Sequence, residues 1–252
     1  NVSNDLAKMM TGEIAVPLSR GLFPGFAKMN DDMPALAQAF QKSLAISVAI
    51  IAPLGVGLAV VADDVIPLVL GQQWLDTIVF VKWLSLAAVV GSVNQLLSSQ
   101  ILIVSGHESR SAILSWVKLG VLTGAVVVAS SLGGALSIAM ACLAVSLFFL
   151  PVSAMVLANS IPITVREIFL ALWRPAVSSF LMWQAVIFVN PYLDTLAVIR
   201  LFADVCVGGI VYIATYYVTW LLIGRPDGLE QMVLSQLVTR WRKFRRSSVV
   251  QN

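Results

Sequence analysis

The chain has 252 residues, of which 59% are hydrophobic and only 12% are charged, and its formal net charge is +3. Its mean hydropathy is +0.90. A typical soluble domain has about 25% charged residues, and a water-soluble fold of the present composition could not cover its core with polar side chains. The composition therefore excludes an ordinary soluble domain and predicts an all-α, polytopic transmembrane helix bundle.

The first predicted element is a helix over residues 4–27 that is more polar than the rest of the bundle. It carries Lys8, Glu13 and Arg20 in an otherwise apolar sequence. Glu13 and Arg20 are seven positions apart, so they share one helical face and lie about 10 Å apart along the axis. Charges at membrane depth are tolerated where they face a protein interior or a water-filled cavity. The two side chains therefore form either a satisfied ion pair or part of a binding site.

Six further stretches are long and apolar enough to cross a bilayer, which takes about 20 residues of helix. They cover residues 43–62, 83–105, 111–130, 133–158, 168–189 and 201–223. Short connections join several of them, and short connections predict antiparallel neighbours in an up-and-down bundle.

The distribution of Lys and Arg predicts the orientation, because cytoplasmic loops of membrane proteins are enriched in these residues. If the C-terminus is cytoplasmic, ten basic residues lie on that side and three on the other. The ten are Lys28, Lys42, Arg110, Arg166, Arg225, Arg240, Arg242, Lys243, Arg245 and Arg246, and the three are Lys8, Lys82 and Arg200. The tail 225–252 also repeats apolar residues at helical spacing. We expect it to be a basic amphipathic helix on the anionic leaflet, serving as a topology anchor or a partner-binding site.

Lys118 is the leading functional candidate among the charges within the spans. Ser111, Ser115 and Lys118 follow i, i+4, i+7 spacing and form a polar stripe on one helical face. Lys118 either lines a cavity or snorkels back to the head groups. For Arg174 we favour snorkelling, because its helix comes late in the chain and is expected at the periphery of the bundle.

Other polar residues near or within the spans have structural interpretations. Asn94 and Gln95 lie in the middle of a span, where amides usually join helices and in fewer cases contact a polar substrate. Arg200 and Asp204 are one turn apart and can pair with each other. The adjacent Asp63 and Asp64 lie at the end of a span and are expected to be solvated.

The sequence contains no recognisable catalytic or cofactor-binding constellation. It has one histidine, His107, and two cysteines, Cys142 and Cys206, which lie in apolar runs. Neither metal-ligand spacing nor a phosphate-binding loop is present. We expect a protein that is not an enzyme, has no cofactor or metal and does not bind nucleic acid.

Several short strings in the first half of the chain, taken in order, resemble a known family. They are Asn-Asp-Leu-Ala with Leu-Phe-Pro-Gly-Phe-Ala-Lys within 4–28, Phe40-Gln-Lys42, Pro53-Leu-Gly-Val-Gly57, Val69-Leu-Gly71-Gln-Gln-Trp74 and Ser105-Gly106. The Leu-Gly-x-x-Trp string after the first long span is the most specific of these. Together they are similar to polysaccharide flippases of the Wzx type, in the multidrug/oligosaccharidyl-lipid/polysaccharide exporter superfamily.

The resemblance implies a fold of two six-helix lobes facing a central cavity. Residues 1–159 would form the C-terminal lobe, 160–224 two additional transmembrane helices and 225–252 the cytoplasmic tail. The chain starts at Asn1 and shows no signal sequence, so we expect a fragment whose partner is the N-terminal lobe of the same protein.

The function that the resemblance implies is translocation of undecaprenyl-pyrophosphate-linked oligosaccharides across the bacterial inner membrane for surface polysaccharide or lipopolysaccharide synthesis. The partners would be this substrate and membrane lipids. Arg20 and Lys118 would contact the pyrophosphate, and Glu13, Asn94 and Gln95 could bind sugars.

Two alternatives remain open. A multidrug cation exporter of the same architecture would need carboxylates facing the cavity, and only Glu13 fits that role. A non-transporting scaffold of a glycan-assembly complex is favoured only by the basic tail.

Overall fold

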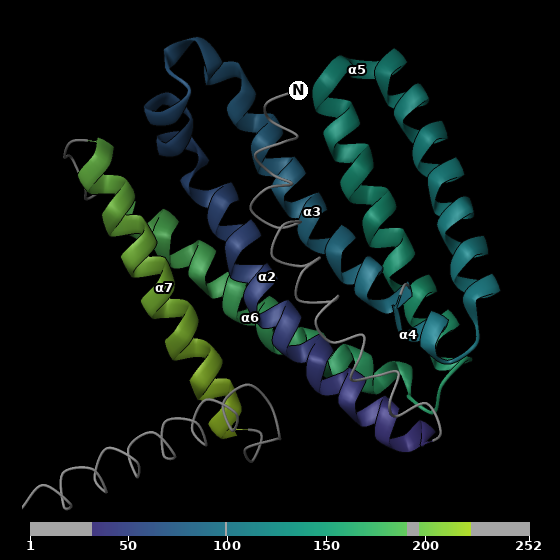
Figure 1. Ribbon diagram of the computed structural model, residues 1–252. Helices are drawn as coiled ribbons and strands as arrows, with labels where there is room; N and C mark the ends of the chain where they lie inside the picture. Colours follow the sequence, from purple (N-terminus) through teal and green to yellow (C-terminus); the bar gives the residue numbers. More distant parts are fainter. Residues whose placement is uncertain (1–31, 99, 191–196, 223–252) are drawn as a thin grey trace, which may run out of the picture.

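The computed structural model describes residues 32–98, 100–190 and 197–222, and every element in these ranges is helical (Figure 1). The expected polar helix 4–27, with Glu13 and Arg20, and the expected tail 225–252 lie outside the described residues. In chain order the elements are α2 (Met33–Val69), the 3-10 helix η1 (Gln72–Thr77), α3 (Ile78–Ser98), α4 (Gln100–Val104), α5 (Glu108–Ala158), α6 (Val165–Val189) and α7 (Ala197–Leu222).

The described part contains six helical segments that are long and apolar enough to span a membrane, which confirms the predicted polytopic bundle. They are Met33–Val69, Gln72–Val104, Glu108–Ser131, Gly133–Ala158, Val165–Val189 and Ala197–Leu222. Each contains one predicted span, apart from the last residue of 83–105 and the last residue of 201–223. Successive segments run in opposite directions (Figure 1), so the connections alternate between the two ends of the bundle. The cytoplasmic location of the C-terminus stays a prediction.

Helix α2 lies at the centre of the bundle and is the most buried of the spans. It contacts α3, α6 and α7. The Asp32 carboxylate caps its first turn by accepting a hydrogen bond from the backbone N–H of Ala35 at 3.0 Å. With 37 residues it rises about 55 Å, well beyond the roughly 30 Å hydrocarbon core of a bilayer. The helix begins at Met33, ten residues before the predicted span 43–62.

Two apolar clusters hold α2 in place at its two ends. The larger one joins the first half of α2 to the ends of α3, α5 and the start of α6, through Leu36, Phe40, Leu44, Leu97, Leu157 and Ile168 among others. The smaller one surrounds the turn into η1. There Gly71 adopts a φ of +91°, which favours glycine, and Trp74 packs against the cluster of Leu58, Ala62, Ile66 and Val81. This geometry accounts physically for the Leu-Gly-x-x-Trp string.

Helix α5 is a hairpin of two helices joined at Gly133 and Gly134. Gly134 has a φ of +69° and a ψ of −150°, a conformation that is open essentially to glycine alone. The two halves lie side by side (Figure 1) and pack through Leu114, Val145 and Phe149. The break lies where the predicted spans 111–130 and 133–158 meet.

Helix α6 is not peripheral, and the expectation that Arg174 snorkels to the head groups is wrong. Helix α6 packs against both α2 and α7. The Arg174 side chain is 8% exposed, with its guanidinium carbon 4.6 Å from the centre of the Tyr216 ring of α7. Its Nη2 donates to the Tyr216 carbonyl oxygen at 3.4 Å. A neighbouring helix therefore covers the charge, which the sequence of α6 alone could not indicate.

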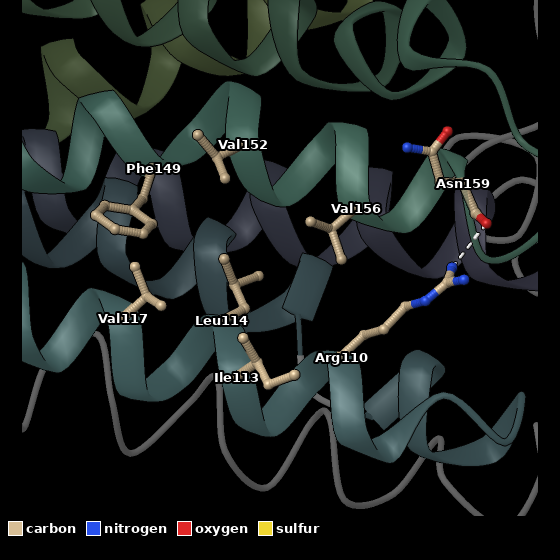
Figure 2. Close-up of a pocket in the computed structure, with 8 residues that line it drawn as sticks. All are labelled: Arg110, Ile113, Leu114, Val117, Phe149, Val152, Val156 and Asn159. Atoms are coloured by element: carbon tan, nitrogen blue, oxygen red, sulfur yellow. Dashed lines mark hydrogen bonds between the residues drawn. The ribbon is translucent and has the colours of Figure 1, made fainter.

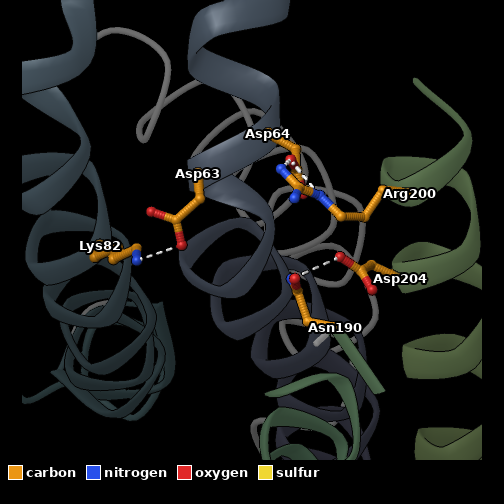
Figure 3. Close-up of polar contacts among 6 residues, drawn as sticks. All are labelled: Asp63, Asp64, Lys82, Asn190, Arg200 and Asp204. Atoms are coloured by element: carbon orange, nitrogen blue, oxygen red, sulfur yellow. Dashed lines mark hydrogen bonds and ion pairs between the residues drawn. The ribbon is translucent and has the colours of Figure 1, made fainter. Parts of the chain in front are cut away.

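The polar residues at the opposite end of the bundle also differ from the predictions (Figure 3). Asp63 is exposed and pairs with Lys82 at 2.6 Å, but Asp64 is 1% exposed. The Arg200 guanidinium binds Asp64 through both Nε, at 2.8 Å, and Nη2. Arg200 therefore pairs with α2 and not with Asp204 on its own helix. The prediction that both Asp63 and Asp64 are solvated is wrong for Asp64.

Candidate functional site

Lys118 lies on the inward stripe of the first half of α5. The more buried positions of this half are Ser111, Leu114, Lys118, Leu122, Ala125 with Val126, and Ala129, at the spacing of one helical face. Leu114, Leu122 and Ala125 pack against Val145 and Phe149 of the second half. Lys118 is half-buried between these apolar turns, so it is the charged member of the contact face of the hairpin. This placement favours the interpretation of Lys118 as a residue of the protein interior.

Only one of the two serines predicted to share the Lys118 stripe is buried. The Ser111 hydroxyl donates to the Ser98 carbonyl oxygen at 2.5 Å and ties α5 to the end of α3. The Ser115 side chain is exposed, and its hydroxyl donates to the Ser111 carbonyl oxygen of its own helix at 2.8 Å. These bonds position the first turns of α5, and Lys118 follows two turns after Ser111.

A groove of about 440 Å³ runs between the two halves of α5, and we call it the α5 groove (Figure 2). Apolar side chains from both halves form its walls. Arg110 and Asn159 lie at one end. Its lining residues are Arg110, Ile113, Leu114, Val117, Phe149, Val152, Val156 and Asn159. Lys118 is not among them, but it directly follows Val117 in the helix.

The Arg110 guanidinium is held at the end of the α5 groove by the turn that follows the helix. Its Nη1 donates to the Asn159 carbonyl oxygen at 2.8 Å and to the Ser160 hydroxyl at 2.9 Å. A cation at this place is also favoured by the exposed carbonyl groups at the C-terminus of α5. The side chain remains exposed, so part of the guanidinium faces outward from the groove.

The α5 groove combines two chemistries that an anionic lipid presents. An apolar channel suits an acyl or polyprenyl chain, and a guanidinium at the channel mouth suits a phosphate, which arginine binds through directed N–H groups. Arg110 and Lys118 are eight residues apart, about 12 Å along the helix. A second cavity of about 330 Å³, between α2, α3, α5 and α6, has Ser179 as its one polar lining residue, and so offers no charge to a head group.

Asn94 has the geometry of a residue that joins two helices. Its side chain is fully buried, and its Nδ2 donates to the Ser146 carbonyl oxygen at 2.7 Å. The Ser153 hydroxyl donates to the Asn94 Oδ1 at 3.1 Å. Both partners belong to the second half of α5, whereas the neighbouring Gln95 side chain is exposed. Contact of either amide with a sugar stays a prediction.

We expect Asn94→Leu to lower the free energy of unfolding by about 1–2 kcal/mol, because it removes both hydrogen bonds that the Asn94 side chain makes with α5. Gln95→Leu, the matched change at the exposed neighbour, should stay within about 0.5 kcal/mol. Thermal unfolding of the detergent-purified variants measures both values. If Asn94→Leu is as stable as the parent but inactive, Asn94 contacts substrate and does not serve mainly to join helices.

Sequence reasoning placed Arg110 only among the basic loop residues and did not identify it as a site residue. Arg110 is the third residue of its helix and lies at the end of the short connection 105–110. From the sequence, its positive charge indicated only the orientation of the span. The groove depends on the return of α5 to Asn159, which is 49 positions further along the chain. Of the predicted site residues, the structure describes Lys118, Asn94 and Gln95, and it does not bring Lys118 to the groove surface itself.

The helices define a multi-pass membrane protein, and the α5 groove is an apolar groove with Arg110 at one end. A family model described as polysaccharide biosynthesis protein matches residues 1–79. Lipopolysaccharide biosynthesis protein WzxC of Escherichia coli K12 is 27% identical over 176 residues, covering 69% of this chain and 36% of that protein. A protein of Klebsiella pneumoniae, described as an uncharacterized membrane protein in the cps region, is 26% identical over 242 residues, covering 93% of this chain and 48% of its own length. No solved structure matches the chain.

These comparisons confirm the resemblance to Wzx-type polysaccharide flippases that the sequence predicted. The match to the Klebsiella protein runs through nearly the whole chain, including the region beyond the first 110 residues. The chain spans less than half the length of these two relatives.

Proposed function

We propose that this chain is part of a flippase that moves undecaprenyl-pyrophosphate-linked oligosaccharides across the bacterial inner membrane for surface polysaccharide or lipopolysaccharide synthesis. The observation that carries the proposal is the basic pair Arg110 and Lys118 on the apolar α5 hairpin. A lipid-linked pyrophosphate needs cationic donors beside an apolar surface, and the similarity to a lipopolysaccharide biosynthesis protein supports this class of substrate.

The transport cycle would be alternating access, in which two lobes rock about a central site. In this proposal residues 1–159 belong to the C-terminal lobe and work with an N-terminal lobe of the same protein. The C-terminus lies in the cytoplasm, as the basic residues predict. Arg20 would join Lys118 in binding the pyrophosphate, and Glu13, Asn94 and Gln95 would contact sugars.

Lys118→Ala in the complete protein should lower the amount of surface glycan by about tenfold or more. Losing a charge-assisted contact of about 1.5–3 kcal/mol corresponds to a change of that size in affinity. Quantifying surface glycan, and lipid-linked precursor in the inner membrane, in a strain that carries only the variant gives the measurement. Lys118→Arg keeps the cation and should retain most of the activity.

Lys82→Ala is the matched control, because it removes a lysine that pairs with exposed Asp63 at the other end of the bundle. It should leave the surface glycan near the parental level. Equal protein levels in the membrane make the comparison valid. Unchanged glycan in Lys118→Ala would reject the anion-binding role, and export of cationic dyes by the same protein would instead favour the multidrug exporter.

A further inference from the structure

Asp204 is a buried carboxyl group at the junction of α2, α6 and α7 (Figure 3). Its side chain is 1% exposed. The Asn190 amide of α6 donates to its Oδ2 at 3.3 Å. Its Oδ1 is buried and has no hydrogen-bond partner among the described residues. One oxygen of this carboxyl therefore has a weak donor, and the other faces the interior of the junction.

The charges around Asp204 do not balance. Within the described residues the junction holds three carboxyl groups, Asp63, Asp64 and Asp204, and two cations, Lys82 and Arg200 (Figure 3). Each cation is bonded to another carboxylate: Lys82 to Asp63, and Arg200 to Asp64. Asp204 thus remains as the third negative charge, with a neutral amide as its hydrogen-bond partner.

A buried, ionised carboxylate is strongly disfavoured when one of its oxygens accepts no hydrogen bond. The neutral acid in the same place loses at most one hydrogen bond. The charge can be removed by a proton or by a bound cation. No group of three or more His, Cys, Asp or Glu side chains that could hold a metal ion occurs in the described ranges. In this arrangement the Asn190 amide gives Asp204 an N–H donor and not an oxygen ligand for a metal ion.

We propose that Asp204 is a proton-binding site, whose carboxyl group carries a proton while α7 is packed against α2 and α6. The charged and polar groups that act on it are Arg200 on α7, Asp64 on α2 and Asn190 on α6. Asp63 of α2 and Lys82 of α3 form their own ion pair on the other side of α2 (Figure 3). Loss of the proton would leave a bare carboxylate beside Asp64 and between closely packed helices. One turn further along α7, a Cβ atom added to Gly208 would lie 3.4 Å from the side chains of Met182 and Val186 of α6, so the two helices pack in van der Waals contact there.

Protonation of Asp204 therefore favours the packed position of α7, and deprotonation favours its displacement. The inference concerns the chemistry of this junction and holds whichever substrate the protein moves. In the proposed flippase it would link proton exchange to helix movement, and only that link rests on the proposed function.

Infrared difference spectroscopy of the full-length protein in lipid nanodiscs tests the proposal directly. At neutral pH the parent should show a carbonyl stretch of a protonated carboxylic acid that shifts in D₂O. Asp204→Asn, which has nearly the same shape and no titratable proton, should lack this band. Asp204→Glu should move the band without abolishing it, and Asp64→Asn should retain it.

Thermal unfolding provides a second measurement. The parent should lose stability relative to Asp204→Asn as the pH rises above about 4, where a free aspartic acid ionises, because the unfolded chain then releases a proton that the folded Asp204 retains. The proposal is overturned if the parent and Asp204→Asn have the same protonated-carboxyl spectrum at neutral pH. It is also overturned if added sodium ions, at constant ionic strength and pH, replace the effect of protons on stability. Neither readout depends on transport, so failure here leaves the flippase proposal standing.

Discussion

Replacing Arg200 with Ala is expected to lower the free energy of unfolding by about 3 kcal/mol, the largest loss among the variants considered. Removing one partner of a buried ion pair leaves an uncompensated charge, which typically costs about 3–5 kcal/mol. The Asp64 side chain is 1% exposed and the Arg200 side chain 34% exposed, so the buried member is the one left without its partner. Partial exposure of Arg200 places the expected loss at the lower end of that range.

The double variant Asp64→Asn/Arg200→Ala should recover most of the lost stability, because it removes the stranded charge along with its partner. Asp64→Asn alone should cost about 1 kcal/mol, since Arg200 can still be solvated. Thermal or denaturant unfolding in detergent micelles gives the four values of this cycle. Equal losses for the two single variants would show that Asp64 is much better solvated than its burial indicates.

Replacing Tyr216 with Leu should destabilise the protein by about 2 kcal/mol. The Tyr216 ring lies under the Arg174 guanidinium and stacks on the Tyr212 ring with a centroid distance of 5.8 Å. A desolvated cation–π contact contributes up to about 2 kcal/mol and an aromatic pair about 0.5–1.5 kcal/mol. Leucine keeps an apolar side chain at this place but offers neither a ring face nor a quadrupole.

Tyr216→Phe is the matched control, because it retains the ring and removes only the hydroxyl group. It should stay within about 1 kcal/mol of the parent in the same unfolding measurement. If Leu and Phe have equal effects, the ring contacts contribute little to the stability of the protein.

The apolar spans were predictable from the sequence because their boundaries carry local signals. The second half of α5 begins and ends at the predicted residues, 133 and 158, since glycines mark its start and the asparagine-containing turn its end. Helix α2 extends further than predicted. Its first ten residues are too polar to count as a membrane span, yet they form helix because Asp32 caps them and they pack in the large apolar cluster.

The polar partners were much harder to predict, because each pair joins helices that are remote in the sequence. Arg200 binds Asp64 across 136 positions, although Asp204 lies one turn away and offered a local partner. The partner choice is set by how α7 is rotated against α2, and no periodic pattern in either helix specifies that rotation. The place of Arg110 at the α5 groove was not predictable for the same reason, since this groove forms only when α5 folds back on itself.

Helix α7 contributes no residue to any of the three apolar clusters formed by the described residues. Besides its packing against α6 and α2, directional contacts spaced along its length hold it: Arg200 with Asp64, the Tyr212 hydroxyl with the Ala49 carbonyl oxygen, and Tyr216 with Arg174. Apolar surfaces can slide past each other gradually, but a displacement of one helical turn, about 5.4 Å, would break all three contacts together. We therefore expect α7 to have a single bonded position against the bundle, with all three contacts formed or all three broken.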